Sequence, residues 1–184
     1  MNDLLLNLIL TLDASFRVCT PLIFASMAGL FSERSGGVDI GLEGKLLMSA
    51  FIAASAASFF GSAWIGLLFA IFASCIFAMV HGLASITFKG NQIVSGVAIN
   101  ILASGLTMIL TLAWFKSGGI TPNLQGDERF LSITLPGVNI IDHIPILGVI
   151  YRELISGHNI LVYLAFATVP LVWWVVYRTR FGLR

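Results

Sequence analysis

Long apolar runs, each bounded by polar or charged residues, dominate the pattern along this chain of 184 residues. A membrane-spanning helix needs about 20 predominantly apolar residues. The runs do not alternate between apolar and polar positions, as the strands of a membrane barrel would. Helices pair their backbone polar groups internally, so we expect an all-α, polytopic bundle of transmembrane helices. The five predicted spans are residues 14–31, 46–60, 63–86, 93–115 and 160–177.

The edges of this pattern carry three further expectations. Residues 2–12 precede the first span and predict a separate amphipathic helix that lies on the membrane surface. The second span is short, and an earlier start near Leu42 would lengthen it. Residues 116–159 form the only extended polar region and contain several prolines and glycines, which predicts an irregular loop with short helical turns.

Composition supports the membrane interpretation. The chain is 58% hydrophobic and 10% charged, with a mean hydropathy of +0.96. In soluble domains about a quarter of the residues are charged. A water-soluble fold with the composition of this chain could not bury so much apolar surface. The formal net charge of +1 provides no global field for nucleic acid, and we expect membrane lipid as the surroundings. The sequence thus predicts a multi-pass protein of the cell (inner or plasma) membrane.

Lysine and arginine positions orient the predicted spans, because cytoplasmic loops are enriched in both residues. With the C-terminal arginines placed in the cytoplasm, the inner positive residues are Arg34, Lys45, Lys89, Arg178, Arg180 and Arg184. The outer positive residues are Arg17, Lys116, Arg129 and Arg152. This excess of six over four favours a cytoplasmic C-terminus and an external N-terminus.

Small and polar residues inside the spans leave alternatives open. The third span carries a stripe of small residues at four-residue spacing, which indicates either helix packing within one fold or a subunit interface. That stripe is Gly66, Ala70, Ser74, Ala78 and Gly82. One face of the fourth span carries Asn100, Ser104, Thr107 and Thr111, which predicts either interhelical hydrogen bonds or a polar path. His81 is expected to be a packed or interface-facing histidine rather than a proton carrier.

Residues 31–45 are rich in glycine and charge and lie between two apolar spans. Composition leaves two interpretations open. The segment is either a cytoplasmic loop, where charges meet water, or a broken helix partly inside the membrane, whose free amides face solute. Its charged residues are Glu33, Arg34, Asp39, Glu43 and Lys45.

Several ordered blocks resemble the permeases of the branched-chain amino acid, ribose and nucleoside class of ABC importers, and more narrowly the nucleoside and simple-sugar branch. The blocks are residues 20–23 (TPLI), 29–36 (GLFSERSG), 38–44 (VDIGLEG), 90–96 (GNQIVSG) followed by Asn100, and 178–184 (RTRFGLR). Many family members have Asn at the position of Asp39. The resemblance implies that residues 1–184 are one transmembrane permease domain, the N-terminal portion of a longer family domain, and that the chain is truncated.

The same resemblance implies partners and site residues. It implies an ABC ATPase subunit, a second permease subunit in a homo- or heterodimer, and an extracytoplasmic solute-binding protein. The expected substrate-pathway residues are Gly37, Asp39, Glu43, Asn91, Asn100 and Ser104. The expected ATPase-coupling residues are Arg178, Arg180, Phe181 and Gly182. The expected solutes are nucleosides or related simple sugars.

No catalytic residue and no metal site is predicted. The chain lacks the GxxxxGK[ST] phosphate loop, so we expect ATP to be hydrolysed by a partner subunit and no cofactor to be bound by this chain. The alternative function is an ion-coupled secondary transporter or channel, for which Asp39 and Glu43 would supply an ion or proton site. That alternative predicts activity driven by an ion gradient without an ATPase.

Overall fold

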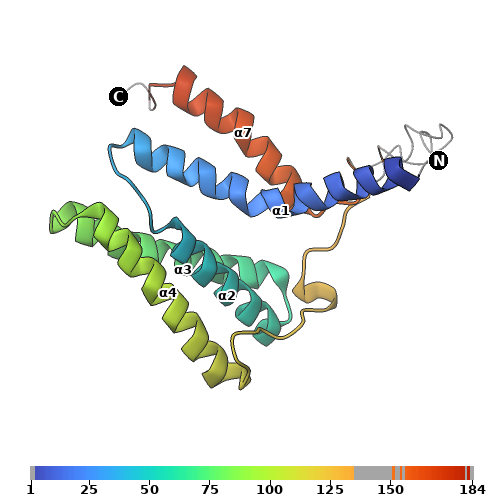
Figure 1. The fold of residues 1–184 in the computed structure, drawn as a ribbon, viewed down its shortest axis with the longest axis horizontal. Coiled ribbons are helices and arrows are strands. Elements are labelled where there is room, and N and C mark those ends of the chain that lie inside the picture. Colours follow the sequence, from blue (N-terminus) through green and yellow to red (C-terminus); the bar gives the residue numbers. More distant parts are fainter. Residues whose placement is uncertain (1–2, 135–150, 152–153, 155, 181, 183–184) are drawn as a thin grey trace. The chain divides into compact units, whose positions relative to one another are not determined.

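The structure, a computed structural model, describes residues 3–134, 151, 154, 156–180 and 182 (Figure 1). Within these residues it is helical, with one isolated bridge between Ser132 and Asn159 and no strand, which confirms the all-α class. The long helices are α1 (Asp3–Arg34), α2 (Leu42–Phe60), α3 (Ala63–Gly82), α4 (Gln92–Phe115) and α7 (Ile160–Arg178). A π-helical turn, Leu83–Thr87, continues α3, and a 3-10 turn, Gly126–Glu128, lies in the predicted outer loop.

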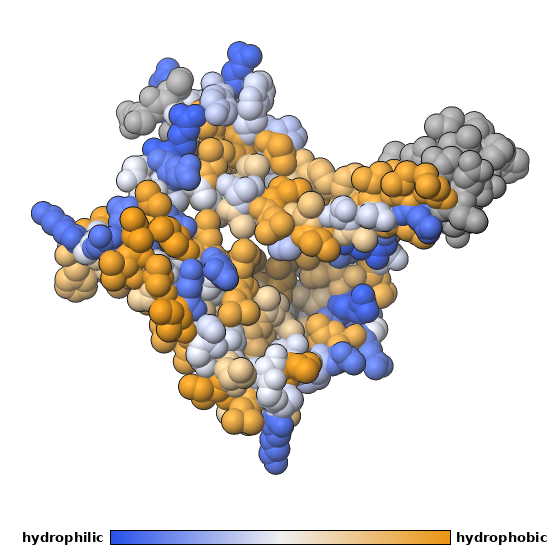
Figure 2. All heavy atoms as spheres, in the orientation of Figure 1, coloured by the Kyte–Doolittle hydropathy of each residue, from blue (hydrophilic) through white to orange (hydrophobic). Residues whose placement is uncertain are grey.

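Five helical segments of the described chain are long and apolar enough to cross a membrane. They are Asn7–Arg34, Leu42–Phe60, Ala63–Thr87, Gln92–Phe115 and Ile160–Arg178. Large apolar side chains such as Leu68, Phe72 and Ile101 are exposed, and apolar atoms cover much of the face in Figure 2. In water this exposure would be costly, whereas lipid tails solvate the same side chains. The chain is therefore a multi-pass membrane protein.

The prediction of a separate surface helix at residues 2–12 is wrong. One continuous helix, α1, runs from Asp3 to Arg34 and joins those residues to the first span. Asp13, the polar residue at which the prediction broke the pattern, is accommodated inside α1 because Arg17, one turn later, pairs with it at 3.1 Å. The second span begins at Leu42, as the earlier of its two proposed starts predicted.

The described chain divides into two compact units. The central unit comprises residues 28–129, and the terminal unit comprises residues 1–27 with 130–184. In the central unit α2, α3 and α4 pack together around a core of Met48, Phe51, Phe77, Ile99 and Ala103.

The small-residue stripe of α3 explains part of this packing. A Cβ on Gly66 would lie 2.7 Å from the Ala53 backbone oxygen of α2, so only glycine permits this approach. Ala70, the next residue of the stripe, is also buried. Gly82, at its far end, has open space where a Cβ would stand. Close packing within the fold thus uses the first half of the stripe.

The described part of the terminal unit consists of the first part of α1, residues 130–134, the residues just before α7 and the whole of α7. The rings of Phe16 and Phe166 meet edge to face at 5.5 Å. The Asn159 side chain caps α7 by accepting a hydrogen bond from the Val162 amide at 3.1 Å. The amide of Ile133 donates to the His158 carbonyl at 2.9 Å, so residues 130–134 are tied to the start of α7.

Candidate functional site

The connection between α1 and α2 contains the strongest sequence motif, and it is not helical. It begins with a tight turn in which Gly36 has a φ of 84°, and the Gly37 amide donates to the Ser32 carbonyl at 3.1 Å. Residues 37–39 have no regular structure, and a turn at residues 40 and 41 leads into α2 at Leu42. The Val38 amide donates to the Gln92 side chain at 2.7 Å, which ties the connection to the first residue of α4.

Asp39 lies at the centre of a buried ionic cluster in this connection. Its carboxylate accepts a 2.5 Å hydrogen bond from the Lys45 ammonium and a 3.1 Å hydrogen bond from the Gly41 amide. The side chains of Asp39 and Lys45 are only 13% and 7% exposed. The charges of this pair are enclosed by protein, whereas the neighbouring Val38 and Ile40 are exposed.

His81 of α3 completes the Asp39 cluster. Its Nε2 lies 3.7 Å from the Asp39 carboxylate, and its Nδ1 lies 3.2 Å from the Ser95 hydroxyl of α4. The ring is buried, as predicted for a packed histidine. Asp39 thus links the connection to α2 through Lys45 and to α3 through His81, and His81 extends the cluster to Ser95 of α4.

Asn100 holds the start of α2 against the middle of α4. Its side-chain oxygen accepts from the Gly44 amide at 2.8 Å, and its side-chain nitrogen donates to the Ile40 carbonyl at 3.1 Å. A Cβ on Gly44 would lie 2.8 Å from the Asn100 Cα, and one on Gly96 would lie 2.9 Å from the Gly41 amide nitrogen. The glycines of the motif therefore permit two backbones to touch, which is the physical reason for their spacing.

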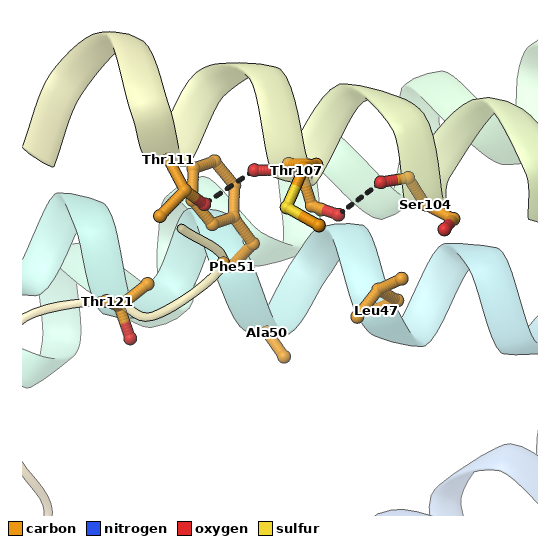
Figure 3. Close-up of a pocket in the computed structure, with 9 residues that line it drawn as sticks. Leu47, Ala50, Phe51, Ser104, Thr107, Thr111 and Thr121 are labelled. Carbon is orange, nitrogen blue, oxygen red and sulfur yellow. Dashed lines mark hydrogen bonds between the residues drawn. The ribbon is translucent and has the colours of Figure 1, made fainter. Parts of the chain in front are cut away.

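A cavity of about 360 Å³ opens between α2, α4 and the segment that follows α4 (Figure 3). The lining residues are Leu47, Ala50, Phe51, Ser104, Thr107, Met108, Thr111, Gly119 and Thr121. Four of them carry hydroxyls, and none of them is ionisable. The cavity therefore suits a neutral solute that has both hydroxyl groups and an apolar surface.

The predicted pathway residues fall into three groups. Ser104 lines the cavity. Gly37, Asp39 and Asn100 belong to the connection and its contacts with α2 and α4. Glu43, in the first turn of α2, and Asn91, which caps α4 through the Ile93 and Val94 amides, are exposed and lie outside the cavity lining.

The predicted coupling residues follow the end of α7. Arg178 is in its last turn and lies 5.7 Å from the Trp173 ring centroid, a cation–π geometry. Arg180 is exposed and Gly182 is partly exposed. Phe181 lies outside the described residues.

A second ionic cluster lies in the terminal unit. The Asp13 carboxylate of α1 lies 3.1 Å from Arg17 and 3.5 Å from the Nδ1 atom of His158. The Nε2 atom of His158 lies 3.1 Å from the Leu154 carbonyl, and the ring is 3% exposed. Nε2 must carry a proton to donate to that carbonyl, and the buried Nδ1 atom has no hydrogen-bond partner among the described residues.

Sequence reasoning missed the partners of the predicted residues. Lys45 was counted as an inner positive charge and as a charged residue of segment 31–45, but its pairing with Asp39 across the start of α2 was not predicted. Thr121 and Phe51 gave no signal, because only the folded chain brings them to the cavity. Thr107 and Thr111 lie on the polar face of α4, for which a polar path was one of the two predictions, and both line the cavity.

Known proteins resemble this chain over almost its whole length. The family described as the permease component of the branched-chain amino acid transport system matches residues 11–184. The guanosine ABC transporter permease protein NupQ of Bacillus subtilis (strain 168) is 35% identical over 188 residues, which cover 99% of this chain and 56% of that protein. The nucleoside ABC transporter permease protein NupC of Lactococcus lactis subsp. cremoris (strain MG1363) is 34% identical, with 90% of this chain and 51% of that protein covered.

A third relative has a sugar in its name. The putative glucose ABC transporter permease protein TsgC13 of Haloferax volcanii is 32% identical, with 94% of this chain and 49% of that protein covered. The chain thus spans about half the length of the curated relatives it matches. No solved structure matches this chain.

Proposed function

Because this chain belongs to the family of permease components of the branched-chain amino acid transport system, we propose that it forms part of the membrane channel of an ATP-driven importer for nucleosides or related simple sugars. Its partners in this proposal are an ABC ATPase subunit, a second permease subunit and an extracytoplasmic solute-binding protein. Its location is the cell membrane. ATP is hydrolysed by the partner subunit, and no cofactor is held by this chain.

One observation of the structure supports the proposal of a neutral, hydroxyl-rich solute. The cavity between α2 and α4 offers four hydroxyls and the apolar side chains of Leu47, Phe51 and Met108, without an ionisable side chain in its lining. Nucleosides and simple sugars are neutral and rich in hydroxyl groups. A neutral solute that displaces water from a charged side chain in the path cannot compensate that charge, and burying an uncompensated charge costs free energy. The buried Asp39–Lys45 pair avoids this cost, because its two charges neutralise each other and neither residue lines the cavity.

The predicted site residues take distinct roles in this proposal. Ser104 contacts solute, whereas Gly37, Asp39 and Asn100 position the connection against α2 and α4. Glu43 and Asn91 extend the path at the exposed ends of α2 and α4. At the end of α7, the segment from Arg178 to Gly182, with Arg180 and Phe181, contacts the ATPase.

The direct test is uptake by the assembled transporter in proteoliposomes. Labelled guanosine, uridine and glucose are offered, with glutamate as a charged control. We expect ATP-dependent uptake of at least one neutral solute and none of glutamate. Uptake driven by an ion gradient in the absence of the ATPase would instead establish the secondary transporter.

A filling variant tests the cavity itself. Ala50→Phe places a ring in the cavity and should abolish uptake without loss of the ATPase from the purified complex. Ala113→Phe, which adds the same ring at an exposed position of α4 outside the lining, is the matched control and should transport normally. Normal uptake by Ala50→Phe would contradict the assignment of this cavity to the path.

A further inference from the structure

The hydroxyl groups of the cavity differ in what they can still offer a solute. A serine or threonine hydroxyl has one proton to donate and two lone pairs to accept with. The Thr107 hydroxyl donates to the Ser104 carbonyl at 3.0 Å, and the Thr111 hydroxyl donates to the Thr107 carbonyl at 2.5 Å (Figure 3). Both protons are thereby used inside α4. These two threonines present only lone pairs to the cavity.

Ser104 and Thr121 are in a different state. Among the described residues neither hydroxyl has a hydrogen-bond partner, although both residues line the cavity. Ser104 contributes its carbonyl to Thr107, and its hydroxyl keeps the proton. Each of the two hydroxyls can therefore donate as well as accept.

The four hydroxyl residues differ in exposure and in their position along the cavity. Thr111 is buried, Thr107 and Thr121 are partly exposed, and Ser104 is exposed. In Figure 3 Thr121 and Ser104 lie towards opposite ends of the lining, with Thr107 and Thr111 on α4 between them. A solute in the cavity would thus meet donors near the two ends and acceptors in the middle.

We infer that Ser104 and Thr121 are the specificity-determining residues of this cavity, because they can donate hydrogen bonds to oxygen atoms of a solute whereas Thr107 and Thr111 can only accept. The inference rests on the proposed function and deepens it. It identifies the preferred solute as one with hydroxyl or ether oxygens near both ends and a hydroxyl or N–H donor towards its middle. Loss of one neutral hydrogen bond should raise the KM for uptake roughly fivefold.

The test couples variants of the chain with analogues of the solute. Uptake of a nucleoside and of its 2′-, 3′- and 5′-deoxy analogues is measured with the assembled wild-type transporter, Ser104→Ala and Thr121→Val. For the hydroxyl that faces Ser104, Ser104→Ala should raise the KM for the parent nucleoside roughly fivefold and leave the KM for that deoxy analogue unchanged. Thr121→Val should show the same coupling with a different hydroxyl.

Thr107→Val is the matched control, since it removes a cavity hydroxyl that has no proton to give. The 2′- and 3′-fluoro analogues keep an acceptor but lack a donor. Ser104→Ala should abolish the preference for the relevant fluoro analogue over the deoxy analogue, and Thr107→Val should leave that preference intact. A merely structural role of Ser104 would raise the KM for every solute equally.

The outcomes separate the two proposals. If the wild-type transporter takes up nucleosides but Ser104→Ala and Thr121→Val change no ratio between hydroxylated and deoxy solutes, the inference is overturned while the proposed function stands. Loss of the preference for the fluoro analogue in Thr107→Val, as in Ser104→Ala, also overturns it. A wild-type complex that transports no neutral solute overturns the proposed function, and the inference with it.

Discussion

The two units of this chain each contain an aspartate, a basic residue and a histidine, yet they expose them differently. In the central unit Asp39 pairs with Lys45, whose side chain is 7% exposed, and His81 lies against the same carboxylate. In the terminal unit Asp13 pairs with Arg17, whose side chain is 59% exposed, and His158 is the buried member. The two aspartates themselves are equally exposed, at 13%.

The difference shows that the environment of the basic partner decides what an ion pair contributes. A long cation that reaches solvent loses little when its partner is removed, because water replaces the interaction. A cation and an anion that are both buried depend on each other, since removal of one leaves an uncompensated charge. The central cluster is therefore expected to control stability, and the terminal cluster is expected to depend more on its histidine than on its arginine.

The largest expected effect comes from breaking the central pair. Lys45→Met leaves the Asp39 carboxylate with the Gly41 amide and His81, and should destabilise the protein by about 3–5 kcal/mol. The measurement is thermal unfolding of the full chain in detergent, followed by tryptophan fluorescence. Asp39→Asn in the Lys45→Met background removes the orphaned charge and should recover most of the loss. Equal stability of Lys45→Met and wild type would show that the pair is solvated after all.

The central cluster also marks the limit of sequence reasoning. The spans followed from hydropathy because each apolar run must find lipid or protein, and the glycine motif of residues 36–44 pointed to an unusual backbone. The hydrogen bond between Asn100 and Gly44 could not be predicted, because it depends on how α2 and α4 approach each other across a sequence separation of 56. Cysteine pairs, metal ligands and catalytic nucleophiles can be recognised in a sequence by their characteristic spacing, whereas the hydroxyl residues around a cavity have no such spacing.

Asp13 gives the clearest contrast at the terminal unit. The predicted surface helix ended at residue 12 and the predicted first span began at residue 14, whereas α1 is continuous through Asp13, which contacts Arg17 and His158. Local pairing thus overrode a pattern that treats each polar residue as a boundary. Substitutions of Asp13 can therefore test which interactions stabilise the buried ring of His158.

An intermediate effect is expected from Asp13→Ala. It removes the carboxylate that pairs with Arg17 at 3.1 Å, and the loss should be about 1 kcal/mol because Arg17 reaches solvent. Unfolding of the full chain in detergent is compared with Asp13→Asn, whose side-chain amide can donate to the Nδ1 atom of His158, an atom that has no hydrogen-bond partner in the described structure. We expect Asp13→Asn to be the more stable of the two by about 1 kcal/mol. Equal stability of the two variants would indicate that the amide forms no hydrogen bond with Nδ1.

The smallest effect should come from Arg17→Gln. Its guanidinium pairs with Asp13 at 3.1 Å, but because the side chain is mostly exposed the change should cost less than about 1 kcal/mol. The cost should shrink further in high salt, since exposed charges are screened. Measured beside Lys45→Met under the same conditions, it isolates burial of the cation as the variable, because both changes remove a positive partner from an aspartate of equal exposure. A loss for Arg17→Gln as large as that for Lys45→Met would mean that exposure of the cation does not govern the strength of these pairs, and the contrast between the two units would have to be explained by their histidines.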